Sequence, residues 1–280
     1  MALRYARVSG NWADTSTWAA TPTGAVGESV PGSGDTVEIN TSYKSDGSGG
    51  TSAGEIIVTL TGDVEVQALR LYSANSGYDA TIHTASEHTI TCNTYAGGSS
   101  SFAGYSAKIH GYTGLTGNVN FTFTRNGGTT IIIDPGPQGS DKVHDLTFNH
   151  ANLECKLGSA IDIEGNITVT AGTFTTNSAA DGSGTDYALT VDGDVLIGES
   201  SGSGDNAVLD GNASAITING GMKIDVTGKY DATTHANGTV INKYLAGGGV
   251  YALQLIAGGT FIHNDGLVHV TGTGGYSIVI

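Results

Sequence analysis

The side chains that could carry out catalysis are carboxylates in short apolar segments: Asp162 with Glu164, Asp192 with Asp194, and Glu154. Residues two apart on a strand point to the same face, and two carboxylates on one face can cleave a glycosidic bond. The equivalent positions of neighbouring segments carry threonine or asparagine as often as a carboxylate. That variation is typical of a solvated strand face, so we predict no catalytic residue.

Metal ligands and cofactor motifs are sparse. The segment 181–189 (DGSGTDYAL) resembles one copy of a Ca²⁺-binding nonapeptide, but such sites use consecutive copies. We interpret it as an outward polar turn that could take an opportunistic Ca²⁺ ion. His263 and His269 flank a glycine turn without a third ligand, and no phosphate-binding glycine loop occurs in the required context. We therefore predict neither a metal site nor a cofactor.

The two cysteines, Cys92 and Cys155, lie 63 positions apart and have neither CxxC spacing nor a nearby histidine pattern. A zinc site needs closely spaced ligands, whereas cysteine without such a context is among the most buried residue types. We predict two reduced thiols in the core.

The composition excludes several classes of protein. The 280 residues include 44 glycines and carry 11 Lys and Arg against 26 Asp and Glu, a formal net charge of −15. So acidic a chain cannot neutralise a run of phosphates, so we expect neither nucleic acid nor an anionic membrane as a partner. No apolar run approaches the roughly 18–20 residues of a membrane span, and the first residues lack the apolar core of a secretory signal.

A repeat organises the middle of the chain. Three segments share the pattern Ala, apolar, x, apolar, x, Gly, x, apolar, x, apolar, with starts 28 and 27 positions apart: 160–169 (AIDIEGNITV), 188–197 (ALTVDGDVLI) and 215–224 (AITINGGMKI). A weaker copy covers 58–66, and GNVNF (117–121) and GLVHV (266–270) match the second half only. Each full copy predicts two short strands joined at a glycine, which bends the chain or takes a positive φ. The predicted structural glycines are Gly62, Gly165, Gly193 and Gly220.

One such unit cannot bury its apolar row alone, but units stacked at a spacing near 28 residues bury a continuous column. The sequence therefore predicts an all-β fold, a parallel β-helix (solenoid) over 41–280, with Gly/Ser-rich turns projecting outward. A β-sandwich or jelly roll built from the same strands is the alternative.

The first 40 residues differ from the rest. They contain both tryptophans, Trp12 and Trp18, and two of the four prolines. The terminal turn of a solenoid exposes an apolar face and strand edges, so we interpret 1–40 as an aromatic N-terminal cap that leads into a first strand at 36–40. A Trp-lined groove that stacks on sugars is the alternative.

Parts of this opening resemble a known family. Gly10-Asn-Trp12, Thr17-Trp18, Val30-Pro31 and Asp35-Thr-Val-Glu-Ile39 resemble the GxW…TW…VP…D.V.I opening of β-helical surface and virion proteins. Many of these are bacteriophage proteins of tail fibres, spikes or head decorations; others are large bacterial surface proteins with an export signal. The resemblance implies a place on the virion surface and carries no catalytic motif.

We therefore expect a non-enzymatic virion structural protein of a bacteriophage: a fibre, spike or capsid decoration that acts in host attachment. Its expected partners are other virion proteins, further copies of itself in a homo-oligomer, and a host-surface glycan. The alternatives are a polysaccharide-degrading β-helix enzyme and a bacterial adhesin or an ice- or carbohydrate-binding module.

The closing sequence GGYSIVI (274–280) is an apolar strand without a polar cap after it. An uncovered strand edge invites pairing with another chain. We predict that this strand pairs with another chain.

Overall fold

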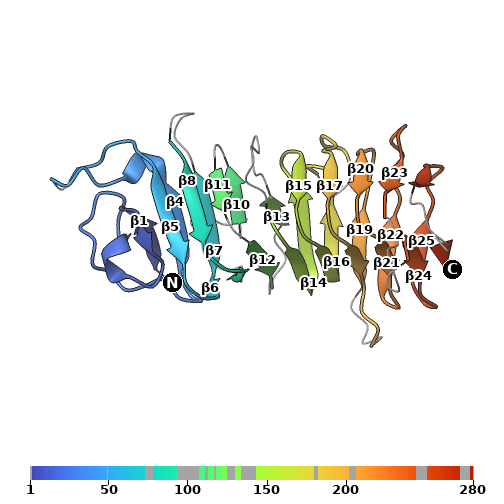
Figure 1. The fold of residues 1–280 in the computed structure, drawn as a ribbon, viewed down its shortest axis with the longest axis horizontal. Coiled ribbons are helices and arrows are strands. Elements are labelled where there is room, and N and C mark those ends of the chain that lie inside the picture. Colours follow the sequence, from blue (N-terminus) through green and yellow to red (C-terminus); the bar gives the residue numbers. More distant parts are fainter. Residues whose placement is uncertain are drawn as a thin grey trace.

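The computed structural model describes residues 2–48, 50–72, 78–93, 107–110, 113–116, 118–124, 130–133, 143–179, 182–201, 206–243, 251–271 and 278–279. In these residues the chain is all-β, with two 3₁₀ turns, η1 (Thr15–Thr17) and η2 (Thr41–Tyr43), and no α-helix. Figure 1 shows an elongated molecule whose strands lie side by side across its long axis. No helix in the described part of the chain has the length and apolarity needed to cross a membrane.

The strands form four hydrogen-bonded sheets. The first contains, in spatial order, β3 (Trp18–Ala19), β1 (Leu3–Ala6), β4 (Thr36–Asn40), β7 (Ala68–Tyr72) and β10 (Ala107–His110). The second contains β2 (Gly10–Asn11), β5 (Ile56–Leu60), β8 (Ala80–Thr84) and β11 (Thr113–Thr116). The fourth contains β15 (Ile161–Ile163), β17 (Leu189–Val191), β20 (Ile216–Ile218), β23 (Thr239–Ile241) and β26 (Val268–Val270).

The third sheet runs through most of the molecule. Its main path is β6 (Val64–Val66), β9 (His88–Cys92), β12 (Val119–Phe123), β14 (Leu146–Leu157), β16 (Ile167–Thr175), β18 (Val195–Ile197), β21 (Met222–Ile224), β24 (Leu253–Leu255) and β27 (Ile278–Val279). Off this path lie β13 (Thr130–Ile133), β19 (Ala207–Asp210), β22 (Gly228–Asp231) and β25 (Thr260–Ile262). Between the named strands, every described pairing is parallel except the antiparallel pair of β1 with β3.

Equivalent residues lie in register along the third sheet. This register column contains Val64, Ile90, Phe121, Leu146, Ile167, Val195, Met222 and Leu253. We call the stretch of chain between successive members a repeat unit. In the fourth sheet β15, β17, β20 and β23 bury their first and third side chains and turn the middle one outward, as alternation requires. In β26 the alternation is the same, but Val268 and Val270 are only partly buried. The inward residues join one hydrophobic core along the molecule.

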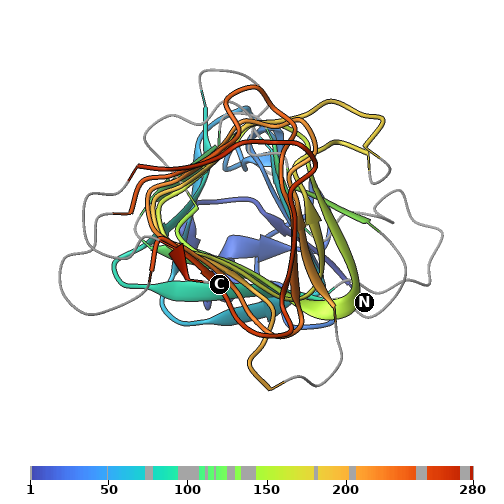
Figure 2. The same ribbon diagram turned by 90° about the vertical axis from the view of Figure 1, so that its right-hand side faces the viewer.

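The two longest strands, β14 and β16, turn a corner together. Their register shifts between Phe148 and Glu154, where Gly172 takes a φ of +90° and a Cβ would lie 2.6 Å from the His150 carbonyl oxygen. The third sheet therefore covers two sides of the molecule. Seen along the long axis, the strands outline a rough triangle around the core (Figure 2).

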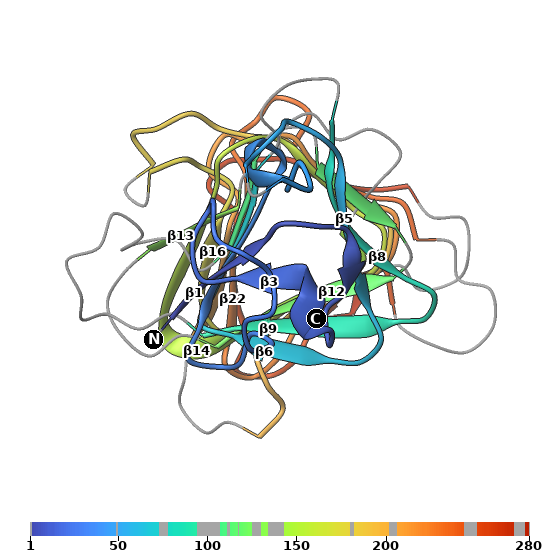
Figure 3. The ribbon, with the colours of Figure 1, turned by 90° about the vertical axis from the view of Figure 1, so that its left-hand side faces the viewer.

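The N-terminal residues are part of the parallel sheets, which corrects the expectation that the first strand is 36–40. β1 pairs in parallel with β4, and β2 with β5, while β3 covers the outer edge of β1. The view from this end is shown in Figure 3. A second correction concerns GLVHV: β26 is in register with β23 of the fourth sheet, so this segment corresponds to the first half of the repeat.

A buried arginine holds the N-terminal loops together. Arg7 is 1 % exposed, and its guanidinium donates to the carbonyl oxygens of Tyr43 at 2.6 Å and of Gly24 and Gly50 at 2.5 Å. A buried cation requires such partners. One side chain thus ties three loops to β1.

Candidate functional site

The predicted glycines occupy one structural position, two residues before a member of the register column. The Gly193 amide donates to the Gly165 carbonyl at 2.9 Å, and the Gly220 amide donates to the Gly193 carbonyl at 3.0 Å. A Cβ at any of these three would lie closer than 3.0 Å to a carbonyl oxygen of the preceding unit. None of the four takes a positive φ, so close backbone approach, and not backbone conformation, is the reason for glycine at Gly165, Gly193 and Gly220. An added Cβ at Gly62 would meet no atom within 4 Å.

In five repeat units the residue directly before the register-column residue belongs to a polar ladder that the sequence pattern did not reveal. Side-chain Oδ1 atoms at this position accept the backbone amide of the equivalent residue one unit later, at 2.5–3.2 Å. The accepting residues are Asp63, Asn120, Asp145, Asn166 and Asp194. Asn166 and Asp194 lie in full copies of the sequence repeat. The backbone amides that they accept can be identified only once the register of the strands is known.

The candidate catalytic carboxylates do not converge on a cleft. Asp192 accepts from Asn219 Nδ2 at 2.7 Å, and Asn219 Oδ1 accepts from Asn242 Nδ2 at 2.9 Å, in a second ladder on the outer surface. Asp194 accepts from Lys243 Nζ at 2.8 Å.

The remaining carboxylates also occupy outer positions of the sheets. Asp162 lies on the outer face of the fourth sheet, in register with Thr190. Glu164 is exposed and directly follows β15, the strand that contains Asp162. Glu154 lies 3.5 Å from Lys156 Nζ on the outer face of β14. The candidate carboxylates therefore form contacts between repeat units or lie on the outer surface of the sheets.

One cluster in the described residues has metal-binding side chains close together. Ligand atoms of Glu87, His144 and Asp145 lie within 4.8 Å of one another. Buried Asn120 links all three: its Nδ2 donates to Glu87 Oε1 at 2.9 Å, and its Oδ1 lies 3.0 Å from His144 Nδ1 and accepts the Asp145 amide at 3.2 Å. Because Asp145 also holds the Asn166 amide, this hydrogen-bond network accounts for the cluster as part of the ladder.

The segment that resembles a Ca²⁺ nonapeptide is organised by a buried amide. Asn177, which is fully buried, donates from Nδ2 to Asp186 Oδ1 at 2.7 Å and to the carbonyls of Gly182 and Gly184. Its Oδ1 accepts the Gly184 amide at 3.0 Å. The Asn177 amide thereby occupies the carbonyl and carboxylate oxygens that could otherwise coordinate a Ca²⁺ ion. Residues 180–181 and 202–205 of the predicted polar turns lie outside the described residues.

The cysteines and the paired histidines have no part in a site. Cys92 and Cys155 are free and buried, as predicted. Burial raises the pKa of the Cys92 thiol to about 12 and that of Cys155 well above its usual value, so both stay protonated and unreactive. His269 is exposed on β26, and His263 lies beside an apolar cavity at the C-terminal end.

The tryptophans pack against each other inside the N-terminal end. Their rings meet edge to face at a centroid distance of 5.0 Å, with Trp12 2 % and Trp18 0 % exposed. Neither ring therefore offers a face on which a sugar could stack, and the interpretation as a stacking groove is wrong in that form. Trp18 Nε1 donates to the Trp12 carbonyl at 2.7 Å, whereas Trp12 Nε1 has no partner among the described residues.

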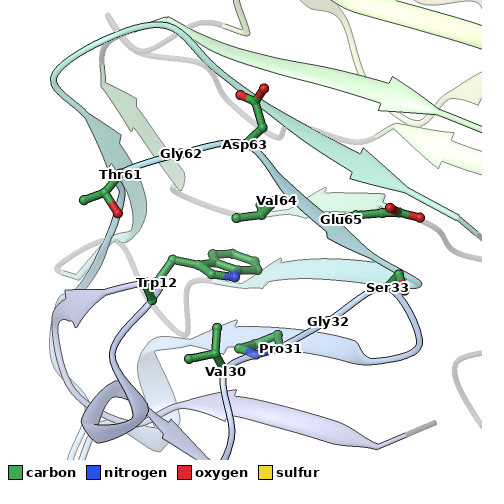
Figure 4. Close-up of a pocket in the computed structure, with 11 residues that line it drawn as sticks. Trp12, Val30, Pro31, Gly32, Ser33, Thr61, Gly62, Asp63, Val64 and Glu65 are labelled. Carbon is green, nitrogen blue, oxygen red and sulfur yellow. The ribbon is translucent and has the colours of Figure 1, made fainter.

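A cavity of about 420 Å³ opens beside Trp12 and Gly62. Its walls come from Trp12 after β2, from the loop 30–33 before β4, and from residues 61–65 at the turn into β6. Figure 4 shows the indole between Val64 and the pair Val30 and Pro31, with the indole nitrogen on the edge that faces this pair.

The cavity is rigidly built. The Trp12 amide donates to the Thr59 carbonyl at 2.8 Å, which fixes the indole to β5. Asp35 accepts the amides of Gly32 at 3.1 Å and Ala2 at 3.0 Å, which fixes the loop. Of the GxW…TW…VP…D pattern, Trp12, Val30 and Pro31 line the cavity, while Trp18 packs against Trp12 and Asp35 fixes the loop.

Two carboxylates at the mouth of the cavity were not singled out in the sequence. Asp63 and Glu65 are exposed residues of the same edge. Asp63 Oδ1 accepts the Thr89 amide at 2.9 Å, and Glu65 accepts from Asn93 Nδ2. The GD pair at 62–63 was the available signal, since it matches the GD pair at 193–194.

Comparison of the chain with protein families, with curated proteins and with solved structures finds no match.

Proposed function

We propose that this chain is a non-enzymatic structural protein of a bacteriophage particle, a parallel β-solenoid that acts as a rigid rod in a fibre, spike or capsid decoration. The observation that carries the proposal is the register column, in which one residue from each of eight strands pairs in parallel with its neighbours along the third sheet. A sandwich or jelly roll would instead rest on antiparallel pairs.

In this proposal residues 1–40 form the aromatic cap and 41–280 the rod. The cap role is supported by β3, which runs antiparallel along the edge of β1, and by the buried pair Trp12 and Trp18. A strand laid against the end of a stack blocks further pairing there. The proposed location on a virion is supported by the resemblance of residues 10–39 to the N-terminal pattern of virion proteins.

An enzymatic role is the weaker alternative. The carboxylates that alternate along the chain are engaged in ladders between repeat units, as for Asp192 and Asp194. A glycosidase needs two carboxyl groups facing a common substrate site, one of them kept protonated. The contacts of the described carboxylates therefore favour a structural role over an enzymatic one.

The test is to locate the protein. Antibodies raised against it should label purified phage particles at one defined position in electron micrographs, and a reconstruction should show a rod of triangular cross-section there. Particles that carry no label would overturn the virion role. New reducing ends from capsular polysaccharides incubated with the purified protein would establish the enzyme instead.

A further inference from the structure

At one place along the polar ladder, a histidine occupies the position that the next two repeat units fill with glycine. The Gly165 amide donates to the His144 carbonyl at 2.7 Å, just as the Gly193 amide donates to the Gly165 carbonyl at 2.9 Å. His144 therefore stands in register with these glycines and adds an imidazole to a row of Asn and Asp side chains.

Oxygen atoms of neighbouring side chains converge on this imidazole. Asn120 Oδ1 lies 3.0 Å and Asp145 Oδ1 3.5 Å from His144 Nδ1, and ligand atoms of Glu87, His144 and Asp145 lie within 4.8 Å of one another. Ligands bound at about 2.0–2.2 Å to a tetrahedral ion stand about 3.3–3.6 Å apart. The two oxygens nearest to Nδ1 are thus spaced much like metal ligands, and the exposed Glu87 side chain can close the remaining gap.

The hydrogen bonds of the ladder leave room for an ion at this place. Asn120 Nδ2 donates to Glu87 Oε1, and Asn120 Oδ1 accepts the Asp145 amide, which fixes the amide with its oxygen towards His144. Asp145 Oδ1 accepts the Asn166 amide. Amide and carboxylate oxygens each have two lone pairs, so one bond to a backbone amide leaves a second lone pair for an ion. Only the hydrogen on His144 Nδ1 has to give way, and Nε2 can carry it instead.

The charges of the cluster also favour a cation. Glu87 and Asp145 bring two carboxylates together, and among the described residues neither forms an ion pair with a lysine or an arginine. Asn120, which bonds to both residues, is only 9 % exposed, so part of the cluster is shielded from water. A divalent ion would relieve the repulsion between the carboxylates, and imidazole nitrogen together with carboxylate oxygen is a ligand set that Zn²⁺ accepts.

We propose that Glu87, Asn120, His144 and Asp145 form a binding site for a divalent transition-metal ion of the Zn²⁺ type. His144 coordinates through Nδ1, and the other three side chains supply oxygen ligands. The site joins three successive repeat units, because Glu87 precedes β9, Asn120 lies in β12, and His144 and Asp145 precede β14. The ion therefore clamps these units together, an inference that goes beyond the proposed function and does not depend on where the protein resides.

The experiment uses the full-length protein without a histidine tag, treated with a chelator and then desalted. Calorimetric titration with ZnCl₂ should show saturable binding of one ion per chain, and CaCl₂ should bind at least about tenfold more weakly, since Ca²⁺ prefers oxygen ligands alone. The melting temperature should rise with the Zn²⁺ concentration, because the ion binds the folded arrangement. Histidine ¹⁵N spectra should show the largest Zn²⁺-dependent shift at Nδ1 of His144, assigned by the loss of its signals in His144→Gln.

Two variants test the assigned ligands. His144→Gln removes the imidazole, and Glu87→Gln removes a charge but keeps an oxygen that accepts from Asn120; each should weaken Zn²⁺ binding at least about tenfold. Without Zn²⁺ both should melt close to the unaltered protein, since Asn120 and Asp145 still serve the backbone amides. His269→Gln on β26 and Glu28→Gln in the N-terminal loop, both at exposed positions, are the matched controls and should leave Zn²⁺ binding unchanged.

Several results would overturn the proposal. They are the lack of saturable Zn²⁺ binding, an unchanged affinity in His144→Gln or Glu87→Gln, and a spectral shift confined to Nε2 of His144. Binding of several ions that persists in both variants would assign the ions to scattered surface histidines and overturn it as well. If His144→Gln does not fold, as judged by circular dichroism, Glu87→Gln decides, because Glu87 is exposed and lies outside the strands. A protein that binds Zn²⁺ at this site but is absent from phage particles refutes the virion role alone.

Discussion

At the residue scale, the joints between repeat units depend on the absence of side chains at one position and on short polar side chains at the next. Gly193 allows the chain to pass within hydrogen-bond distance of Gly165, and Asn166 Oδ1 accepts the Asp194 amide at 2.8 Å. Each joint thereby satisfies backbone groups that would otherwise be unpaired at a corner.

Gly193→Ala should destabilise the protein by about 1–3 kcal/mol, the range for an extra methyl forced into packed surroundings. Its Cβ would meet the Gly165 carbonyl and Asn166 Oδ1. Gly62→Ala is the matched control, because Gly62 has the same position in the register but no atom within 4 Å of an added Cβ; its effect should stay within about 0.5 kcal/mol. Urea denaturation of both variants measures the difference, and equal losses would contradict the close-approach argument.

A second residue-scale prediction concerns Asp210, which lies in register beside Asp231. Burial raises the pKa of Asp210 above the ordinary value of 3.8, and the Asp231 carboxylate raises it further. The folded state therefore binds this proton more tightly than the unfolded state, so the stability contribution of Asp210 falls as the pH rises above 3.8 towards neutrality.

Asp210→Asn should raise the free energy of unfolding at pH 7 by about 0.5 kcal/mol, since like charges on neighbouring strands destabilise a sheet by this order. The gain should vanish below pH 3.8, where the carboxyl is protonated in both states. Thermal melts from pH 3 to 8 check this, with Glu164→Gln as a control of equal charge. A gain that persists at the lowest pH would show that charge is not its cause.

At the element scale, aromatic side chains from neighbouring strands stack inside the third sheet. Phe148 of β14 lies 5.5 Å from Phe123 of β12 and 4.9 Å from Phe174 of β16, measured between ring centroids, with the planes 12° and 19° apart. Phe148 is fully buried and is the middle ring of the three. Phe148 lies near the start of β14 and Phe174 near the end of β16, so the stack reaches across the corner that these two strands turn.

Phe148→Ala should cost about 3–5 kcal/mol, the usual range for truncating a buried phenylalanine. The ring fills the core between β12 and β16, and the cavity left behind would be lined by Phe123 and Phe174. Val26→Ala, at a position 40 % exposed, should change stability by less than about 0.5 kcal/mol. Chemical denaturation compares the two; a loss at Phe148 below 1 kcal/mol would mean that the core closes around the gap.

The sequence predicted the strands in which apolar and polar residues alternate on both sides of a glycine. It did not predict the strands that depend on partners far away in the sequence. The strand pairs in 160–169, 188–197 and 215–224 were predictable because period-two burial and a glycine joint are local signals. β1 and β2 were not, since neither shows the period-two burial around a glycine, and both pair with strands distant in the sequence, β4 and β5. Arg7 and the Trp12 cavity were hidden because the residues around them come from loops up to 53 positions apart, from Trp12 to Glu65.

At the scale of the whole molecule, the two ends differ. The N-terminal end is closed by β3 and the buried tryptophans. At the other end Leu267 is 53 % and Ile262 36 % exposed, beside an apolar cavity of about 290 Å³. β27 pairs with β24 of the same chain along one edge, while residues 272–277 and 280 lie outside the described part.

Deleting residues 276–280 should disrupt self-association and leave the fold intact. The deletion removes β27, the last strand of the third sheet, and exposed strand edges with apolar neighbours are the surfaces through which chains pair. Sedimentation velocity should show a smaller species, with circular dichroism and melting temperature nearly unchanged. An oligomer of the same mass after deletion would contradict the prediction that this strand pairs with another chain.

The polar ladder has a consequence for how such a chain can change over generations. Each Asx oxygen serves the amide of the following unit, so a duplicated stretch of 27 or 28 residues finds its bonding partners already in place on both sides. Gene duplication could therefore lengthen the protein by about 4.8 Å per added unit, and the strands at the two ends would keep their present neighbours.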